Sequence, residues 1–259
     1  MKTIILCGGV GTRLKEETEY KPKPMIYLGG KPVIWHIMKI YSSYGFNEFI
    51  LALGYKADYI KDFFLNQKAF TSDFTLDTKN HHTKFYLDNR TEVDNFKITF
   101  VDTGLPTLPG ERILLCQKYI PKRDKYFMVT YGDGVTNLNI AELLKFHKKQ
   151  KTIGTITGVH PRTKFGLVEV GRGNTVSKFY EKPILPDWVN GGYMVFDKRV
   201  FSYIHPGETE HPMLARLAKE KELSLFKHPG FWFAVDTNKE LEELTRIWNL
   251  GNPPWKVWE

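Results

Sequence analysis

Cysteine is scarce in this chain of 259 residues, and long apolar runs are missing from it. The two cysteines, Cys7 and Cys116, are too few for a disulfide framework, and without clustered histidines they do not make a zinc site. We expect both to be small core residues. No stretch approaches the roughly 18 uninterrupted apolar residues that a membrane-spanning helix needs. The N-terminus turns glycine-rich too soon for a signal peptide, so we expect a cytoplasmic protein with no membrane partner.

Positive charge exceeds negative charge, with 37 Lys and Arg against 29 Asp and Glu, a formal net charge of +8. Such a surplus occurs in proteins that bind nucleic acids, in proteins that bind small polyanions, and on lysine-rich surfaces. Here the basic residues are spread along the chain. The densest run, residues 145–151, looks like a solvated helix end. We therefore do not expect nucleic acid as a partner.

Strand and helix signals alternate through the first half of the chain. Buried strands are predicted at residues 3–7, 48–53, 97–102 and 126–131. Helices are predicted at residues 32–44, 57–64, 112–118 and 140–149. Repeated strand–helix–strand units imply an α/β protein with a mostly parallel sheet covered on both faces by helices.

The second half changes character and is richer in strand signals. Strands are predicted at residues 152–159, 167–170, 175–180, 192–196 and 231–235, and helices at 198–204, 213–220 and 238–250. Residues 67–95 are polar and poorly periodic, which indicates an insertion: a hairpin, an oligomer contact or a solvated loop. The tail at 252–259 has two tryptophans and two prolines. It is too apolar to be free, so we expect it to pack on the body or on a neighbouring subunit.

A glycine-rich loop directly follows the first predicted strand and reads LCGGVGTRL over residues 6–14. Three glycines in four positions let the backbone approach a ligand closely and point its N–H groups inward. The phosphate-binding P-loop pattern is absent. The dinucleotide fingerprint is also absent, because Leu14 stands where it needs a glycine. A structural turn would explain such a loop as well, but Arg13 beside it suits a triphosphate.

The continuation of the loop strengthens the phosphate interpretation. Pro22 and Pro24 flank Lys23 and restrict the backbone on both sides of it. A lysine held in this way can be directed at a phosphate. Arg13 can fork onto phosphate oxygens, while Lys23 supplies a compact point charge. We expect these two cations to be the catalytic residues.

The pattern GGxGTRL followed by PKPM resembles the start of the nucleotide-sugar pyrophosphorylases. The resemblance continues nearly to the end of the chain, through VDTG at 101–104, YGDG at 131–134, FG at 165–166, EKP at 181–183, NGG at 190–192 and DT at 236–237. Several stretches are most similar to the glucose-1-phosphate cytidylyltransferase branch, namely PVIWHIM at 32–38, TYGDGV at 130–135, HPGFW at 228–232 and PWKVWE at 254–259.

The resemblance implies a Rossmann-like, mixed but mostly parallel sheet flanked by helices, with a smaller sugar-binding part. It implies one nucleotidyltransferase domain over residues 1–259, with a nucleotide-binding half at 1–150 and a sugar-phosphate-binding half at 151–259. The implied reaction transfers CMP from CTP to α-D-glucose 1-phosphate and gives CDP-glucose, a precursor type for surface polysaccharides such as O-antigen, and pyrophosphate. The family and the aromatic tail also suggest a homo-oligomer.

The same resemblance implies the contacts of the two substrates. The nucleotide is expected on Leu6, Cys7, Gly8, Gly9, Val10, Gly11, Thr12, Arg13, Lys23, Thr107, Arg112 and Gly132. The sugar phosphate is expected on Glu181, Lys182, Asn190 and Gly191. The segment at 184–189 departs from the glycine-rich linker of the family, which leaves the identity of the sugar open.

Two aspartates are candidates for a magnesium site. Asp133 follows the strand at 126–131, and Asp236 ends the strand at 231–235. We expect both at the carboxyl ends of strands, where open α/β sheets bind ligands. Magnesium prefers one or two carboxylates together with substrate oxygens, and nucleotidyl transfer needs a divalent ion to neutralise charge.

The sequence is also compatible with alternative functions. The same chemistry with UTP, dTTP or another sugar 1-phosphate fits the same motifs. A non-catalytic nucleotide-sugar-binding regulatory protein would share the fold, although the presence of Arg13, Lys23, Asp133 and Asp236 argues against it. A dehydrogenase is the weakest alternative.

Overall fold

A seven-stranded sheet forms the centre of the protein in this computed structural model, which describes residues 1–11, 14, 18–86 and 94–258. The strand order is β14-β10-β13-β8-β1-β4-β7. The strands are β1 (Lys2–Cys7), β4 (Glu48–Leu53), β7 (Lys97–Asp102), β8 (Tyr126–Tyr131), β10 (Gly154–Val159), β13 (Val189–Asp197) and β14 (Leu223–Lys227). Within this sheet β13 alone runs antiparallel to its neighbours, so the predicted mostly parallel, mixed sheet is confirmed.

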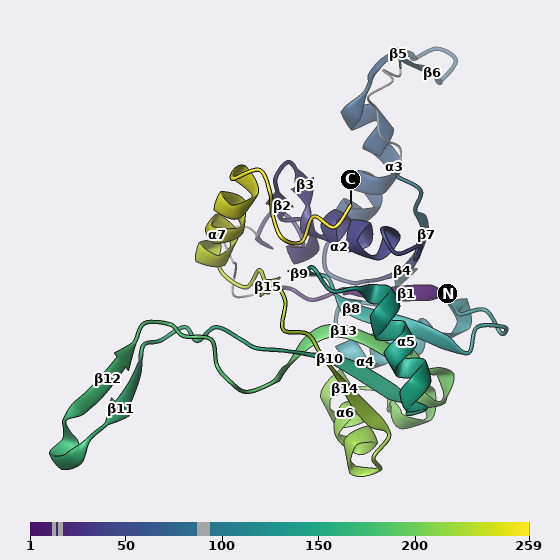
Figure 1. Cartoon of the computed structure of the whole chain (residues 1–259). Helices are drawn as coiled ribbons and strands as arrows, with labels where there is room; N and C mark the ends of the chain where they lie inside the picture. Colours follow the sequence, from purple (N-terminus) through teal and green to yellow (C-terminus); the bar gives the residue numbers. More distant parts are fainter. Residues whose placement is uncertain (12–13, 15–17, 87–93, 259) are drawn as a thin grey trace.

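Helices cover both faces of this sheet (Figure 1). α2 (Val33–Ser42) and α5 (Ile140–Gln150) lie on one face, and α4 (Pro109–Leu115) and α6 (Glu210–Lys219) lie on the other. Side chains along a strand point alternately to the two faces. In β1, accordingly, Ile5 and Cys7 pack in the core under α2 and α5, while Ile4 packs in the core under α4 and α6.

The predicted elements are largely present, with shifted ends. The helix predicted at 112–118 begins earlier, at Pro109, and is followed by the short 3-10 helix η3 (Gln117–Tyr119). The segment predicted as a helix at 198–204 is the 3-10 helix η5 (Lys198–Tyr203). Strand β14 was not predicted, because its residues, Leu223–Lys227, are only partly buried at the edge of the sheet. None of the helices in the described ranges is long and apolar enough to cross a membrane.

A small antiparallel ribbon lies beside the sheet and consists of β9 (Gly134–Thr136) and β15 (Trp232–Ala234). A second one joins β2 (Tyr27–Leu28) and β3 (Lys31–Pro32) directly after the 3-10 helix η2 (Lys23–Met25). The strand predicted to end at Asp236 therefore belongs to a separate ribbon, not to the central sheet. The strand predicted at 231–235 is present, and Asp236 lies just past its carboxyl end, as predicted.

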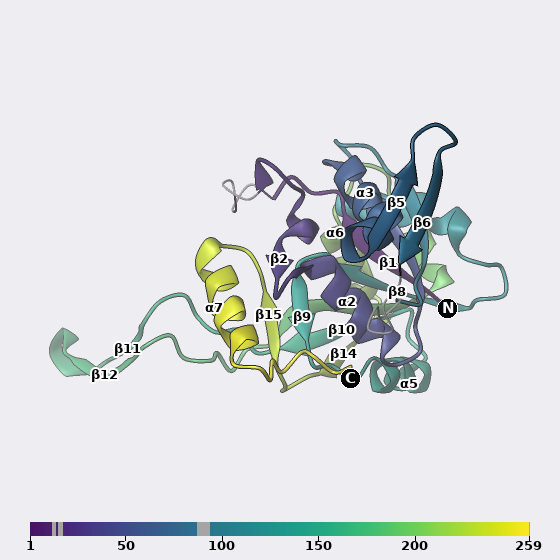
Figure 2. The same cartoon turned by 90° about the horizontal axis from the view of Figure 1, so that it is seen from above.

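Two hairpins project from the body (Figures 1 and 2). α3 (Ala57–Thr71) leads into a hairpin of β5 (Asp73–Asp77) and β6 (His82–Tyr86), which confirms a hairpin within the predicted insertion. The second projection, which we call the arm, spans residues 160–189 and carries the hairpin of β11 (Leu167–Val170) and β12 (Val176–Tyr180), joined through η4 (Arg172–Asn174). The arm extends far from the sheet in both views.

The C-terminal segment packs on the body, as its composition predicted. It follows α7 (Asn238–Asn249), and Trp255 is fully buried. The ring of Trp255 stacks on Phe231 with 5.5 Å between the centroids, and it meets the buried His36 edge-on. The tail thereby closes the core over α2.

Candidate active site

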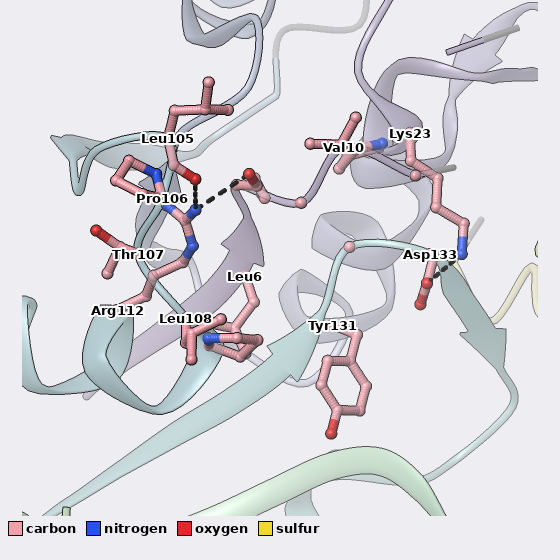
Figure 3. Close-up of a pocket in the computed structure, with 17 residues that line it drawn as sticks. Leu6, Val10, Lys23, Leu105, Pro106, Thr107, Leu108, Arg112, Tyr131 and Asp133 are labelled. Atoms are coloured by element: carbon pink, nitrogen blue, oxygen red, sulfur yellow. Dashed lines mark hydrogen bonds and ion pairs between the residues drawn. The ribbon is translucent and has the colours of Figure 1, made fainter. Parts of the chain in front are cut away.

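A pocket of about 340 Å³ opens at the carboxyl ends of β1 and β8 (Figure 3). Its walls are the glycine loop after β1, the segment at 105–108 with the start of α4, and the turn that follows β8. The volume lies within the usual range of small-molecule sites. The predicted nucleotide contacts that line it are Leu6, Cys7, Gly8, Gly9, Val10, Gly11, Lys23, Thr107, Arg112 and Gly132. Thr12 and Arg13 lie outside the described residues.

Arg112 braces one wall of the pocket. Its side chain is buried, and its guanidinium donates to the carbonyl oxygens of Leu53, Gly8 and Leu105 at 2.9, 3.1 and 3.2 Å, and to the hydroxyl of Thr103. Figure 3 shows two of these bonds converging from the glycine loop and from Leu105. The planar fork of arginine suits several acceptors at once. In this structure Arg112 therefore fixes the glycine loop to the opposite wall.

The glycines of the loop have a steric reason as well as a functional one. A Cβ on Gly8 would overlap the guanidinium of Arg112, so a side chain there would have to displace that group from its hydrogen bonds. Gly11 has a φ of +69°, which strains other residues. Cys7 at the start of the loop is buried, and burial raises the pKa of its thiol. Both cysteines are buried free thiols, as predicted.

Lys23 joins the two aspartates that the sequence singled out. Its ammonium lies 2.6 Å from Oδ2 of Asp133 and 2.6 Å from Oδ1 of Asp236. Burial alone would lower the pKa of Lys23, but the charges and hydrogen bonds of the two carboxylates outweigh it and raise the pKa. Lys23 is therefore fully charged at neutral pH. Lys23 belongs to η2 and Asp133 to the turn after β8, and both line the pocket. Asp236 comes from the segment after β15 and contacts Lys23 beside it.

The ribbon of β9 and β15 explains why the two aspartates meet. Asp133 directly precedes β9, and Asp236 follows β15 by two residues. The antiparallel register pairs Gly134 with Ala234, so both aspartates lie at the same end of the ribbon. A hydrogen bond of 2.9 Å from the backbone N–H of Val235 to the carbonyl oxygen of Asp133 secures this end.

This donor set fits magnesium. Within the described ranges no group of three or more His, Cys, Asp and Glu side chains comes together. Mg²⁺ is commonly held by one or two carboxylates together with substrate oxygens, and Asp133 and Asp236 supply two carboxylates that meet at one point.

Tyr131 lines the pocket, although no role of its own was predicted for this first residue of the YGDG motif. It lines the floor, and its hydroxyl donates to Oε1 of Glu210 at 2.5 Å. Glu210 is buried at the start of α6, 79 residues away in the chain. Burial first, and Glu210 second, raise the pKa of the Tyr131 phenol. No local motif marks this pair, because only the packing of α6 against the sheet creates it.

The predicted sugar-phosphate residues fall into two groups. Asn190 and Gly191 begin β13 on the body, and the indole N–H of Trp232 donates to the carbonyl oxygen of Gly191 at 2.7 Å. The next residue, Gly192, leaves no room for a Cβ beside the ring of Tyr131. This places the start of β13 against the floor of the pocket.

Glu181 and Lys182 are instead at the base of the arm, and they do not line the pocket. Their side chains pair with each other at 3.3 Å and are 65% and 40% exposed. The other strand of this base is tied to the body, because Lys164 pairs with Glu240 at 3.2 Å. Glu240 in turn accepts a hydrogen bond from the backbone N–H of Asp236. The base of the arm thus lies near the aspartate cluster.

Comparison with known proteins agrees with this geometry. The family described as "Nucleotidyl transferase" matches residues 2–222. The chain belongs to this family. It is 42% identical to "Probable glucose-1-phosphate cytidylyltransferase" of Bacillus subtilis and 40% identical to "Glucose-1-phosphate cytidylyltransferase" of Salmonella typhimurium, over 100% of the chains in both comparisons. The resemblance inferred from the motifs is therefore confirmed.

Solved structures of more distant proteins show the same fold. The structure of HddC from Yersinia pseudotuberculosis complexed with GMP-PN superposes with a TM-score of 0.68 at 24% identity, covering 95% of this chain and 99% of that one. The inositol-1-phosphate CTP transferase from T. maritima superposes with a TM-score of 0.68 at 14% identity, covering 100% and 97%. The nucleotidyltransferase fold predicted for this family member is thus confirmed.

Proposed function

We propose that the protein transfers CMP from CTP to α-D-glucose 1-phosphate and releases CDP-glucose and pyrophosphate. The observation that carries this proposal is the meeting of Lys23, Asp133 and Asp236 at the edge of the glycine-loop pocket. The full-length relatives named as glucose-1-phosphate cytidylyltransferases support the choice of both substrates.

The reaction is a direct in-line displacement. A phosphate oxygen of the sugar 1-phosphate attacks the α-phosphorus of CTP, the new P–O bond forms, and the bond from the α-phosphorus to the leaving pyrophosphate breaks. The attacking phosphate is already ionised at neutral pH, so no strong general base is needed. Catalysis then consists of positioning and charge neutralisation.

Different residues of this chain carry out the positioning and the charge neutralisation. The glycine loop presents backbone N–H groups to the nucleotide, with Thr107, Arg112 and Gly132 around it. Arg13 stabilises the triphosphate and the leaving group, and Lys23 the α-phosphate. Asp133 and Asp236 would hold Mg²⁺, which when bound neutralises negative charge on the phosphates. Glu181, Lys182, Asn190 and Gly191 receive the sugar phosphate.

We also propose that the protein acts as a homo-oligomer whose arm packs on a second copy. The hairpin exposes apolar side chains on both strands, including Leu167, Val168, Val170, Val176 and Phe179. An isolated two-stranded hairpin is at best marginally stable in water, so this surface needs a cover. We place the enzyme in the cytoplasm, with soluble substrates and no nucleic-acid or membrane partner.

Assembly through the arm is tested by light scattering. Val168 and Phe179 are directly paired across the hairpin. Changing both to Glu puts two charges into the proposed contact and should reduce the molar mass in solution. The matched control is Gln150→Glu, which adds a charge at an exposed polar position of α5, outside the arm. An unchanged molar mass of the double variant would reject the arm as the contact.

The proposed reaction is tested by measuring pyrophosphate release over a grid of four NTPs and several sugar 1-phosphates with magnesium. CTP with glucose 1-phosphate should give the highest rate. Higher rates with UTP or dTTP would move the assignment to another base, and no release from any pair would favour a regulatory protein. An absence of NAD binding would exclude the dehydrogenase alternative.

Variants connect this activity to the site. Lys23→Ala and Asp236→Asn should each lower turnover by about a hundredfold or more, since the first removes a cation that neutralises developing charge and the second removes a carboxylate that would hold Mg²⁺. Asp58→Asn, at an exposed position of α3, is the matched control. If Lys23→Ala or Asp236→Asn kept near-normal turnover, that residue would not belong to the catalytic site.

A further inference from the structure

Lys23 serves as the counter-ion of two carboxylates in this structure. Its ammonium contacts Oδ2 of Asp133 and Oδ1 of Asp236, each at 2.6 Å, across sequence separations of 110 and 213 residues. The side chain of Lys23 is 15% exposed, and those of the aspartates are 28% and 27% exposed. Short charge-assisted hydrogen bonds of this kind are strong. The protein itself therefore supplies one positive charge to the aspartate pair, which leaves the three groups with a net charge of −1.

We propose that the Lys23 ammonium keeps free divalent cations from binding to the carboxylates of Asp133 and Asp236. When a nucleotide binds, the ammonium moves to one of its phosphates and the two carboxylates become available to a cation. This inference rests on the proposed function, in which the same two carboxylates hold the cation and the same lysine meets the α-phosphate. A lysine and a divalent cation repel each other. They therefore compete for the oxygens of Asp133 and Asp236.

The position of the Lys23 backbone supports such a transfer of its ammonium. Pro22 and Pro24 restrict the chain, and η2 is closed by hydrogen bonds of 2.8 Å from Met25 N–H to the Pro22 carbonyl and 3.1 Å from Ile26 N–H to the Lys23 carbonyl. The side chain begins beside the glycine loop, because the Lys23 Cβ would lie 3.2 Å from a Cβ built on Gly11. The base of this side chain is thus fixed at the loop, and its flexible end reaches the carboxylates.

Two consequences follow. Without a nucleotide, the wild-type protein should bind a divalent cation weakly, since binding has to displace the ammonium. A phosphate bound at the glycine loop offers the ammonium a new partner and frees the carboxylates. Cation binding and nucleotide binding are then coupled through Lys23, and this coupling is reciprocal.

The test measures cation binding without substrates or turnover. Mn²⁺ alone is titrated into the full-length protein, and free Mn²⁺ is counted by electron paramagnetic resonance. Lys23→Met keeps the length of the side chain and removes its charge. This variant should bind Mn²⁺ at least about tenfold more tightly than the wild type, because a charge-assisted competitor has been removed. Lys145→Met is the matched control, since it removes one charge from a side chain that is 77% exposed.

Further variants test whether the gain in Mn²⁺ affinity arises at the aspartate pair. Adding Asp236→Asn to Lys23→Met should abolish the gain, because the pair has lost a carboxylate. Lys23→Arg should keep the weak binding of the wild type. If Lys23→Met does not fold, as judged by circular dichroism, Lys23→Gln takes its place with the same expected gain.

Two outcomes would overturn the inference: equal or weaker Mn²⁺ binding by the neutral Lys23 variants, or a gain that survives Asp236→Asn. Neither outcome depends on the nucleotide or sugar that the enzyme uses. The proposed function fails separately, if the substrate grid yields no pyrophosphate while the Mn²⁺ titrations still differ.

Discussion

The hydroxyl of Tyr131 donates to the buried carboxylate of Glu210, with 2.5 Å between Oη and Oε1. This bond joins the floor of the pocket to the first turn of α6. Tyr131→Phe removes the donor and leaves a buried acceptor, which should lower the free energy of unfolding by about 1–3 kcal/mol in urea titrations. Tyr203→Phe is the control, because its hydroxyl donates to Glu220 at the surface. Equal effects of the two substitutions would contradict a special role for Tyr131.

Alanine substitutions at Gly8 and Gly9 test the steric role and the binding role of the glycine loop separately. Gly8→Ala puts a methyl group into the Arg112 guanidinium and should lower the unfolding midpoint. At Gly9 a Cβ meets nothing within 4 Å, so Gly9→Ala should leave the midpoint unchanged. If the nucleotide lies on the loop, Gly9→Ala should still raise the KM for CTP several-fold, because the backbone can no longer approach it closely. An unchanged KM would place the nucleotide elsewhere.

Arg112 should contribute more to stability than any surface arginine. Arg112→Met removes a buried guanidinium that serves four acceptors, and we expect a loss of about 3 kcal/mol or more in the free energy of unfolding. Arg123→Met is the control, because that side chain is 86% exposed. Thermal and urea unfolding of both variants measure the difference. A small effect at Arg112 would mean that water replaces its hydrogen bonds.

The buried position of His36 predicts that the folded protein loses stability in mild acid. It is fully buried, and burial lowers its pKa from 6.5 to about 4. The folded protein therefore keeps His36 neutral while the unfolded chain takes up a proton near pH 6.5. Its contribution to stability is complete above that pH and is lost as the pH falls towards about 4. The loss should reach up to about 3 kcal/mol.

Urea unfolding between pH 7 and 4 measures this dependence. His36→Gln should flatten the decline over this range, even if the variant is less stable at pH 7. The exposed His82 offers the control, because His82→Gln should leave the slope unchanged. A slope in His36→Gln equal to that of the wild type would show that other groups cause the acid sensitivity.

The sequence by itself determined the layered architecture and the pocket-forming loop. Alternating apolar runs and glycine stops are local signals, so β1, β4 and β8 could be predicted from their own residues. The glycine loop and the proline-flanked Lys23 were visible for the same reason. Edge strand β14 carried too weak an apolar pattern to be found.

Only the tertiary structure decided which side chains meet. Asp133 and Asp236 converge because the β9–β15 ribbon pairs segments about a hundred residues apart, and Lys23 joins them from a third segment. Glu210 reaches Tyr131 only through the packing of α6 on the sheet. Such contacts depend on register and packing over the whole chain, and no local pattern of residues encodes them. The same holds for the arm, whose strands were predictable but whose projection away from the body was not.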